Sequence, residues 1–363
     1  MDITVFFLPT IENHFSNFLP LINVLSINDI TSKILLVEEA IPNGRQIIVK
    51  KNNDDILFCR KNEISIILSK NKAFKIFLVV GNDSEPKTCE IIRLFRKYNS
   101  KIILFQDGWL DSKNINNPIY PTKRFFTPLK KQVHKLLTQK WSPVRNYFHN
   151  FIGQNSDYFF VYSEVAKLNF IKADIKKEQI FIVGSPRHHI LKNTNSLSEK
   201  KAKVIFLTVT NSEKELKTVK ECIEWITNFY SNELVILKLH PNEDINNYEE
   251  LIGPNLILLK VDLIDLITQF NIEMSFCFAS TVIFDMLIMN IPIIQLLPID
   301  FSKKHTNYFY DLPSVSNEVD LNYVIKNYEI NKVKKNASKY LKDIAPSFNS
   351  VDATINTIKI LIQ

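Results

Sequence analysis

Residues 275–294 read SFCFASTVIFDMLIMNIPII, and this stretch decides the class of fold. It opens as a short apolar run, passes the small polar pair Ser280-Thr281, continues with apolar residues at helical spacing, and resumes after Pro292 as a second apolar run. Two short apolar runs joined by one helix are typical of a strand–helix–strand unit with parallel strands. We therefore expect an α/β protein.

The same alternation extends along most of the chain. Expected strands cover 3–8, 33–37, 74–80, 101–105, 158–162, 179–184, 204–209, 234–239, 256–260, 273–277 and 292–296. Expected helices cover 13–26, 62–71, 85–98, 128–150, 213–231, 262–270 and 281–289, with further helices after about 319. Residues 46–50 and 55–60, on either side of KKNNDD, are expected to form a hairpin. Such alternation favours parallel sheets that are covered by helices on both faces.

A polar segment divides this pattern in two. LKNTNSLSEKKAK, residues 191–203, is rich in turn residues and has no periodicity, so we interpret it as a linker. The expected units are a Rossmann-like, acceptor-side lobe at 1–190 and a donor lobe at 204–340, with a C-terminal helix at 341–363 that packs back on the first lobe. We expect two doubly wound lobes with a cleft between them.

Composition limits the class of protein. The 363 residues are 45% hydrophobic and 23% charged, which is a soluble globular balance. No apolar stretch reaches the roughly 20 residues that span a bilayer, and MDITVFFLPT lacks the basic start of a signal peptide. The four cysteines are far apart and form no CxxC pair, which favours reduced thiols in a cytoplasmic protein.

The net charge of +7 is concentrated in one segment. Between Ser112 and Ser156 there are eight Lys and Arg residues and no acid, and aromatic and aliphatic residues are interleaved with them. As a helix, 113–145 would carry an apolar stripe and a basic face, which suits contact with an anionic membrane surface. The alternative is an ordinary amphipathic helix that faces the core. No nucleic-acid-binding module surrounds this segment, so we expect no nucleic-acid partner.

Glycine is scarce, with six in the chain. Gly81, Gly108 and Gly184 each directly follow an apolar run. A glycine that is kept in such a chain often marks a place where a side chain does not fit. Loops just past strand ends are also where open α/β sheets bind ligands.

Three strand-end motifs carry candidate chemistry. ILFQDGW, residues 103–109, ends a first-lobe strand at Gln106-Asp107-Gly108-Trp109, and KLHP ends a second-lobe strand at Lys238, His240 and Pro241. The third motif is the pair Ser280-Thr281 at the expected start of a helix. In a two-lobed fold these motifs would face one another across the cleft.

These motifs resemble those of bacterial sialyltransferases, which include polysialyltransferases and lipooligosaccharide sialyltransferases. That group shares a D/E-D/E-G motif, an HP motif and a Ser/Thr pair about forty residues later. The resemblance implies a GT-B fold and an inverting, metal-independent transfer of an acidic sugar, sialic acid or a Kdo-like sugar, from a CMP-linked donor. The acceptor it implies is a glycan or glycolipid of a capsule or lipooligosaccharide. In this chain Gln106 replaces the first acid of the motif.

A second resemblance overlaps the first. IFIVGSPRHHIL, residues 180–191, is similar to the GxPR segment of CDP-glycerol glycerophosphotransferases, with Gly184 and Arg187 in the matching positions. ASTVIFDMLIMNIPII resembles their Ser-Ser, Phe-Asp and Lys-Pro block, with Asp285 in the acidic position. Those enzymes carry Trp-His-Gly where this chain has Gln-Asp-Gly. That departure favours sugar transfer over polyol-phosphate transfer.

The resemblances imply a role for each residue. Asp107 is the base that accepts the proton of the acceptor hydroxyl, and His240 donates to the departing phosphate. Ser280 and Thr281 bind that phosphate at a helix N-terminus. The remaining positions are donor-side at Lys238, Pro241, Gly184 and Arg187, and acceptor-side at Gln106, Gly108 and Trp109. No cofactor other than the nucleotide-linked donor, and no metal, is implied.

Simpler interpretations stay open for these residues. Asp107-Gly108 alone is a common turn, Ser280 can be a helix N-cap, and His240 can bond a backbone carbonyl. Lys238 and Arg187 can be solvent-facing or paired with a carboxylate. NNDD at 52–55 suits a hairpin turn better than a metal site, and the adjacent His188-His189 lack the spacing of zinc ligands.

The sequence thus predicts a cytoplasmic glycosyltransferase, with peripheral contact to the inner membrane through 113–145. A CDP-glycerol-type polyol-phosphate transferase and a catalytically silent nucleotide-binding scaffold remain as alternatives, the latter favoured by Gln106. A hydrolysing UDP-sugar epimerase shares the two-lobed pattern, but the chain lacks its richer set of acidic and basic site residues.

Overall fold

The computed structural model describes residues 3–41, 55–106, 155–298, 312–341 and 348–362, with short gaps inside these ranges. The chain forms two compact units. The first unit comprises Met1–Arg187 and Ala345–Gln363, and the second comprises His188–Ile344. Residues 191–193 belong to a helix and residues 201–203 to a strand, which leaves 194–200 between these two elements.

The first unit is built on one parallel sheet. Its strands are β1 (Ile3–Leu8), β2 (Thr31–Val37), β3 (Ile56–Cys59), β4 (Lys75–Val80), β5 (Lys101–Phe105), β6 (Tyr158–Val161) and β7 (Ile180–Ile182). They lie in the order β3-β2-β1-β4-β5-β6-β7, and each described pairing is parallel. All six residues of β1 are buried, because a central parallel strand is covered on both faces.

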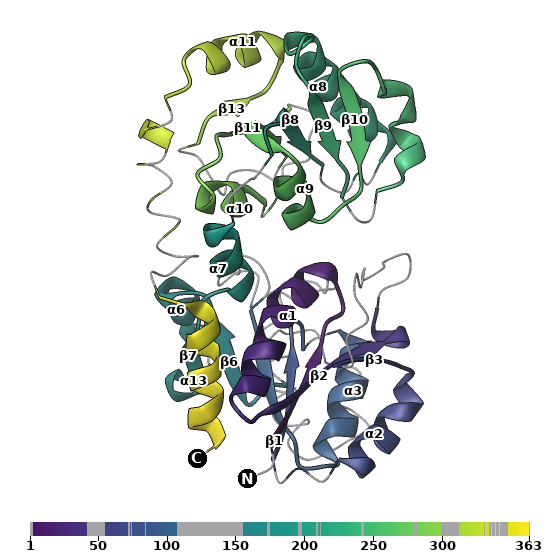
Figure 1. The fold of residues 1–363 in the computed structure, drawn as a ribbon, viewed down its shortest axis with the longest axis vertical. Coiled ribbons are helices and arrows are strands. Elements are labelled where there is room, and N and C mark those ends of the chain that lie inside the picture. The colour runs from purple at the N-terminus through teal and green to yellow at the C-terminus, as the bar shows by residue number, and fades with distance from the viewer. Residues whose placement is uncertain are drawn as a thin grey trace, which may run out of the picture. The chain divides into compact units, whose positions relative to one another are not determined.

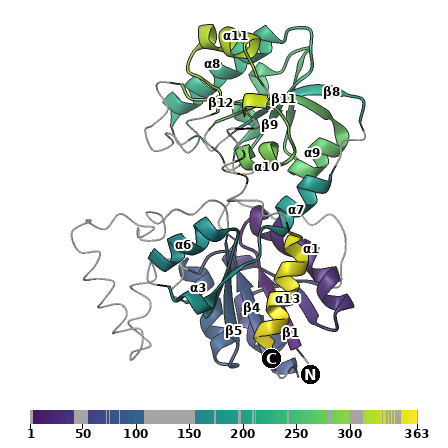
Figure 2. The same ribbon diagram turned by 90° about the vertical axis from the view of Figure 1, so that its left-hand side faces the viewer.

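Helices cover both faces of this sheet. They are α1 (Glu12–Ile27), α2 (Ile64–Lys70), α3 (Pro86–Arg96), α6 (Glu164–Lys172) and α13 (Ser350–Ile362), with short 3-10 turns at Glu38–Ala40, Lys61–Glu63 and Lys177–Gln179. The helix α7 (Pro186–Asn193) begins in the first unit and continues into the second. Figure 2 shows α3 and α6 on one side of the strands and α1 and α13 on the other. Phe18 of α1 packs against Phe7 of β1 and Phe105 of β5, with ring centroids 5.2 and 5.9 Å away.

The C-terminal helix belongs to the first unit. Figure 1 shows α13 beside α1, although more than 300 residues of chain separate them. Lys359 of α13 donates a 2.7 Å hydrogen bond to Asn28 at the end of α1, and Lys75 of β4 donates to the carbonyl of Ile362.

The second unit repeats the architecture on a smaller parallel sheet. Its strands are β8 (Lys201–Phe206), β9 (Val235–Lys238), β10 (Leu256–Leu259), β11 (Asn271–Cys277), β12 (Ile293–Leu296) and β13 (Ser314–Val315), in the order β10-β9-β8-β11-β12-β13. Its helices are α8 (Glu213–Phe229), α9 (Leu263–Gln269), α10 (Val282–Ile288) and α11 (Glu318–Lys326), with 3-10 turns at Ile245–Asn247 and Glu249–Leu251. The stretch 275–294 indeed forms β11, α10 and β12, and the two strands are parallel.

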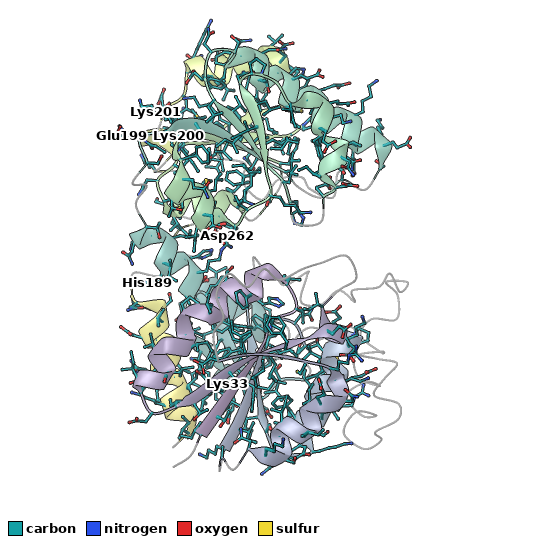
Figure 3. The ribbon with its side chains drawn as sticks, turned by 45° about the vertical axis from the view of Figure 1, so that its right-hand side comes forward. Lys33, His189, Glu199, Lys200, Lys201 and Asp262 are labelled. Atoms are coloured by element: carbon teal, nitrogen blue, oxygen red, sulfur yellow. The ribbon has the colours of Figure 1, made fainter. Side chains whose placement is uncertain are left out.

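Local sequence explains where these helices begin. Ser212 accepts a hydrogen bond from the backbone N–H of Glu215 at the start of α8, and Asn317 does the same for Asp320 at the start of α11. Asp262, labelled in Figure 3, accepts from the N–H of Asp265 at 2.8 Å and caps α9. Side-chain oxygens at these positions satisfy backbone donors that the first turn leaves unpaired.

The expected fold class is confirmed: each unit is a doubly wound α/β layer structure. The expected strands appear within a few residues of their predicted bounds, and β8 begins three residues early, at Lys201. β3 pairs in parallel with β2, with Ile34 opposite Ile56. The expected hairpin between 46–50 and 55–60 stays a prediction. The interval between Val37 and Ile56 is long enough for the crossover that parallel pairing requires. Residues 46–50 and the expected helix 128–150 lie outside the described residues.

None of the described helices is both long and apolar enough to cross a bilayer. All four cysteines are free and buried. Burial raises the pKa of Cys59 to about 11 and the pKa values of Cys89 and Cys222 to about 12. Because a thiolate is the reactive form, these cysteines are unsuited to nucleophilic chemistry.

Candidate functional site

The structure describes about half of the predicted site residues. Gln106, Gly184, Arg187, Lys238, His240 and Ser280 are among the described residues. Asp107, Gly108, Trp109, Pro241, Thr281 and the basic segment 113–145 lie outside the described residues, so their predicted roles stay predictions. The described residues fall into one group in each unit.

In the second unit the candidate residues lie at the point where the strand order reverses. The chain passes from β8 outward through β9 and β10, and then returns to β11 on the other side of β8. His240 follows β9 and Ser280 follows β11, so these residues come from the two strands that flank β8. Because all these strands are parallel, both residues lie at the carboxyl edge of the sheet. Open α/β sheets bind ligands at this edge, next to the switch point.

A buried glutamate ties the loops at this edge together. Glu243 is 4% exposed, and its carboxylate accepts hydrogen bonds from the backbone N–H of Thr210 at 2.5 Å and from the hydroxyl of Tyr248 at 2.8 Å. The Thr210 hydroxyl lies 3.1 Å from both carboxylate oxygens. The N–H of Glu243 donates to the carbonyl of His240 at 3.0 Å, and Lys260 Nζ donates to the carbonyl of Glu243 at 3.0 Å. We call these five residues the Glu243 clamp.

The clamp explains why an apolar strand ends on Lys-Leu-His-Pro. Leu239 is 1% exposed and keeps its side chain in the core. Lys238, on the opposite face of the strand, is half-buried, and its Nζ lies 3.5 Å from the carbonyl oxygen of Leu239. His240 follows as a half-buried residue at the edge of the sheet, where the turn to Glu243 holds its backbone.

Ser280 has the position of a helix cap. Its hydroxyl oxygen lies 3.4 Å from the N–H of Val282, and its carbonyl accepts from the N–H of Ile283 at 3.3 Å. The N-cap interpretation is thus satisfied locally. A capping hydroxyl can also contact a phosphate, so the predicted donor-side role of Ser280 stays a prediction.

The two segments that resemble CDP-glycerol glycerophosphotransferases each contribute one residue to a buried pair. His188, which follows Pro186-Arg187 in α7, places Nε2 3.4 Å from Oδ1 of Asp285 in α10. His188 is 8% exposed and Asp285 is 1% exposed. A nearly solvent-free carboxylate needs such partners to offset its lost hydration. Sequence reasoning dismissed His188 because it considered the residue only as a zinc ligand.

In the first unit the segment before α7 is held by neutral polar groups. Gly184 has φ of 70°, a left-handed conformation that favours glycine. The next residue, Ser185, donates its hydroxyl to Asn17 Oδ1 of α1 at 2.9 Å, and the N–H of Arg187 lies 3.4 Å from the same oxygen. The side-chain amide of Asn17 lies 3.4 Å from the hydroxyl of Tyr162, which follows β6. The GSPR segment is therefore fixed to α1 by a buried amide.

Gln106 has a structural task at the same edge. Its side chain is 3% exposed, and its carbonyl oxygen accepts a 2.8 Å hydrogen bond from the N–H of Tyr162. The backbone N–H of Gln106 donates to the carbonyl of Phe160 at 2.9 Å. Gln106 thus joins the end of β5 to the end of β6, directly before Asp107. The amide at a position where an acid was expected has a physical reason that does not require loss of activity.

Sequence reasoning missed a buried histidine at the switch point of the first unit, between β1 and β4. An added Cβ on Gly81 would lie only 2.2 Å from the ring of His14, so the glycine makes room for the imidazole. His14 is 3% exposed, and the N–H of Thr10 donates to its Nδ1 at 3.3 Å. Because Nδ1 accepts this bond, the ring proton is on Nε2 in the neutral form. Gly81, noted as a retained glycine after a strand, was the signal for this feature.

Among the described residues, no group of three or more His, Cys, Asp and Glu side chains is arranged to hold a metal ion.

No protein-family model matches the chain, and no curated protein matches its sequence. Its fold is similar to that of UDP-GlcNAc 2-epimerase from Neisseria meningitidis bound to UDP-GlcNAc, with TM-score 0.58 and 12% identity over 100% of each chain. The enzyme of the same name from Methanocaldococcus jannaschii, in complex with UDP-GlcNAc and UDP, gives 0.57 and 13% over 99% of this chain and 100% of that one. A histidine-to-asparagine variant of the wall teichoic acid polymerase TagF, soaked with CDPG, gives 0.62 and 14% over 100% of this chain and 90% of that one.

These similarities confirm the GT-B-type fold that was expected from the sequence. TagF is in line with the second resemblance, the one to CDP-glycerol glycerophosphotransferases, whereas these neighbours give no support to the resemblance to sialyltransferases. The epimerases, which sequence reasoning set aside, have the same two-unit architecture.

Proposed function

We propose that this chain is a transferase that uses a nucleotide-activated donor, and that the donor is a CDP-linked polyol phosphate of the CDP-glycerol type. The observation that carries the proposal is the contact between His188 and Asp285. Within the second unit it joins the residue directly after GSPR to the Phe-Asp helix. Both residues belong to the parts of the chain that resemble CDP-glycerol glycerophosphotransferases. The similarity of fold to TagF supports the same choice.

The chemistry assigns one task to each group. The acceptor hydroxyl attacks the phosphorus that carries the polyol, the bond between that phosphorus and an oxygen of CMP breaks, and a phosphodiester forms. Asp107 accepts the proton of the attacking hydroxyl. His240 donates a hydrogen bond to the departing CMP phosphate, and Ser280 and Thr281 bind the same phosphate, so that charge is stabilised where it develops.

Transfer of an acidic sugar from a CMP-linked donor is the second candidate. One observation favours it: Gln106-Asp107-Gly108 is nearer to the sialyltransferase motif than to Trp-His-Gly. Here the bond that breaks joins the sugar carbon to the phosphate oxygen, and CMP leaves as before. Release of CMP therefore does not separate the two reactions.

Two measurements in sequence test the proposal. A thermal-shift series with CMP, CDP, UDP and GDP identifies the base, since a ligand that binds only the native state raises its melting temperature. We expect the cytidine nucleotides to give the larger shifts, and a preference for UDP would remove both cytidine assignments. Phosphorus NMR of the product then shows a new phosphodiester for polyol-phosphate transfer and none for sugar transfer.

Site variants separate an enzyme from a silent scaffold. Because a positioned acid or base contributes typically about 10²–10⁴-fold, Asp107→Ala and His240→Ala should each lower turnover by about that factor. A protein that binds CMP, turns over neither donor, and is unchanged in binding by Asp107→Ala would instead be a scaffold.

We also propose that the basic segment 113–145 contacts an anionic membrane, where a lipid-linked acceptor would be found. Sedimentation with vesicles that contain anionic lipid should retain the protein at low salt, and Lys130→Gln combined with Lys131→Gln and Lys135→Gln should release it. Equal retention on neutral vesicles would contradict this role, because the attraction is electrostatic.

A further inference from the structure

Glu243 is a buried carboxylate to which the sequence resemblances give no role. It lies three residues after His240 and is 4% exposed. Burying a carboxylate costs several kcal/mol, as for other buried ions, unless hydrogen bonds replace its hydration. The Glu243 carboxylate accepts these bonds from two segments: from Thr210, in the loop after β8, and from Tyr248, directly after the 3-10 turn at Ile245–Asn247. The carboxylate therefore fixes two segments at the carboxyl edge of the second sheet.

The backbone of Glu243 continues the arrangement toward His240. The N–H of Glu243 donates to the His240 carbonyl at 3.0 Å, and Lys260, just past β10, donates to the carbonyl of Glu243 at 3.0 Å. The loops after β8, β9 and β10 thus converge on one residue. A shift of the Glu243 side chain would shift the turn that holds His240.

The surroundings of Tyr248 strengthen this link. The Tyr248 side chain is fully buried. Burial, together with the hydrogen bond to Glu243, raises the pKa of the Tyr248 hydroxyl, which favours the protonated form that donates to Glu243. A buried hydroxyl donor of this kind holds the Glu243 carboxylate in one orientation. Residues that support a binding site need such a fixed geometry.

A second cluster of charges in this unit serves as a contrast. Lys203 of β8 is 9% exposed and lies 2.7 Å from Glu273 and 3.0 Å from Glu233. Lys203 pairs with Val235, the first residue of β9, so this cluster lies toward the amino end of the strands, and its neighbour Lys201 marks the start of β8 in Figure 3. It holds strands together away from the loops. The Glu243 clamp has its place at the opposite edge, where ligands bind.

We propose that Glu243 is a positioning residue: it orients His240 toward the donor phosphate and ties Thr210, after β8, to the turn after β9. This rests on the proposed function, because the donor phosphate is what His240 would meet. Glu243 itself touches neither donor nor acceptor.

The experiment uses the full chain labelled with ¹⁵N-histidine and two substitutions of Glu243. Glu243→Met keeps the length of the side chain but removes both acceptors, whereas Glu243→Gln keeps one acceptor for Thr210, and the Tyr248 hydroxyl can turn to accept from the amide. The ring signals of His240, assigned with His240→Gln, report its orientation without any substrate. CDP binding is measured by titration calorimetry on the same samples. Glu250→Gln is the matched control, because that glutamate pairs with Lys220 on the surface.

We expect Glu243→Met to shift or broaden the His240 ring signals and to weaken CDP binding about tenfold, the size of one lost charged hydrogen bond. With Glu243→Gln, the His240 ring signals and the affinity for CDP should be close to those of the unchanged protein. Glu250→Gln should change neither the signals nor the affinity. His240 signals that are identical in Glu243→Met and the unchanged protein overturn the proposal, whatever happens to affinity. If Glu243→Met does not fold, Tyr248→Phe is read by the same criterion with a smaller shift.

The two proposals fail differently. If the unchanged protein binds no cytidine nucleotide while Glu243→Met still shifts the His240 signals, the proposed function is wrong and the positioning role stands. If CDP binds and the His240 signals ignore Glu243, the positioning role is wrong and the proposed function stands.

Discussion

Within each unit, side-chain contacts join the loops at the carboxyl edge of the sheet, and the kind of contact differs between the two units. In the first unit, a close fit and side-chain amides join the loops around the switch point: His14 fills the space above Gly81, Asn17 binds Ser185, and Gln106 binds the N–H of Tyr162. The buried carboxylate of Asp83, after β4, binds Asn155 and Ser156 beside them. In the second unit one carboxylate, that of Glu243, gathers donors from two segments. The same doubly wound architecture thus supports a sterically fitted switch point in the first unit and, in the second unit, loops that meet on one carboxylate.

This difference predicts which kind of substitution destabilises each unit. A neutral, close-packed edge fails when volume changes, because interiors have few voids to absorb an added atom. An edge that depends on one charged acceptor fails when that acceptor is removed, since its donors are left buried without replacement. The three predictions that follow test this contrast, from the largest expected effect to the smallest.

The largest effect is expected at Gly81. Gly81→Ala would place a Cβ 2.2 Å from the His14 ring, so the ring or the loop must move. Overpacking of this kind costs about 1–3 kcal/mol, and we expect the upper end of that range from denaturant unfolding of the first unit. Gly253→Ala is the control in the second unit, because the nearest atom to its Cβ is 4.0 Å away.

A double-mutant cycle decides the cause of that effect. If the clash with the imidazole is responsible, Gly81→Ala should cost little in a His14→Ala background. An equal cost in both backgrounds would show that the glycine matters for some reason other than the ring.

A middle effect is expected at Asn17. Asn17→Ala leaves the hydroxyl of Ser185 and the N–H of Arg187 without their buried acceptor, and Asn17 is 3% exposed. Such a loss costs about 1–3 kcal/mol in the free energy of unfolding. Asn322→Ala, an exposed helical asparagine, should change stability by less than about 0.5 kcal/mol. Equal stabilities of the two variants would show that the hydrogen bonds of Asn17 do not stabilise the first unit.

The smallest effect is expected at Glu273 and depends on pH. Hydrogen bonds from Lys201 and Lys203 hold the pKa of Glu273 below its ordinary value of 4.5. A carboxyl whose pKa is lower in the folded state stabilises the protein above the unfolded pKa, and that contribution is lost as pH falls through the folded value. Glu273→Gln should therefore flatten the acid side of the stability curve by less than about 1 kcal/mol. Acid curves of Glu273→Gln and Glu250→Gln that coincide would contradict this.

Much of the fold follows from local patterns, and the site follows only in part. Runs such as 275–294 carry both the strand and helix periods, so their elements and the parallel sheets could be predicted. The parallel pairing of β3 with β2 could not be predicted from sequence, because an apolar strand pairs equally well in either direction until its neighbours are known. His240 could be predicted as a candidate because a proline and a histidine end an apolar run. Glu243 and His14 depend on partners in other segments, and local spacing carries no trace of those contacts.

The central claim is that a nucleotide donor binds at the carboxyl edge of the second sheet, beside His240 and Ser280. Hydrogen exchange with and without saturating CDP tests it on the unchanged protein. The account predicts slower exchange in the loops after β8, β9 and β11, with no change in the loops after β1 and β4. Protection confined to the first unit, or none with any of CMP, CDP, UDP and GDP, would contradict it.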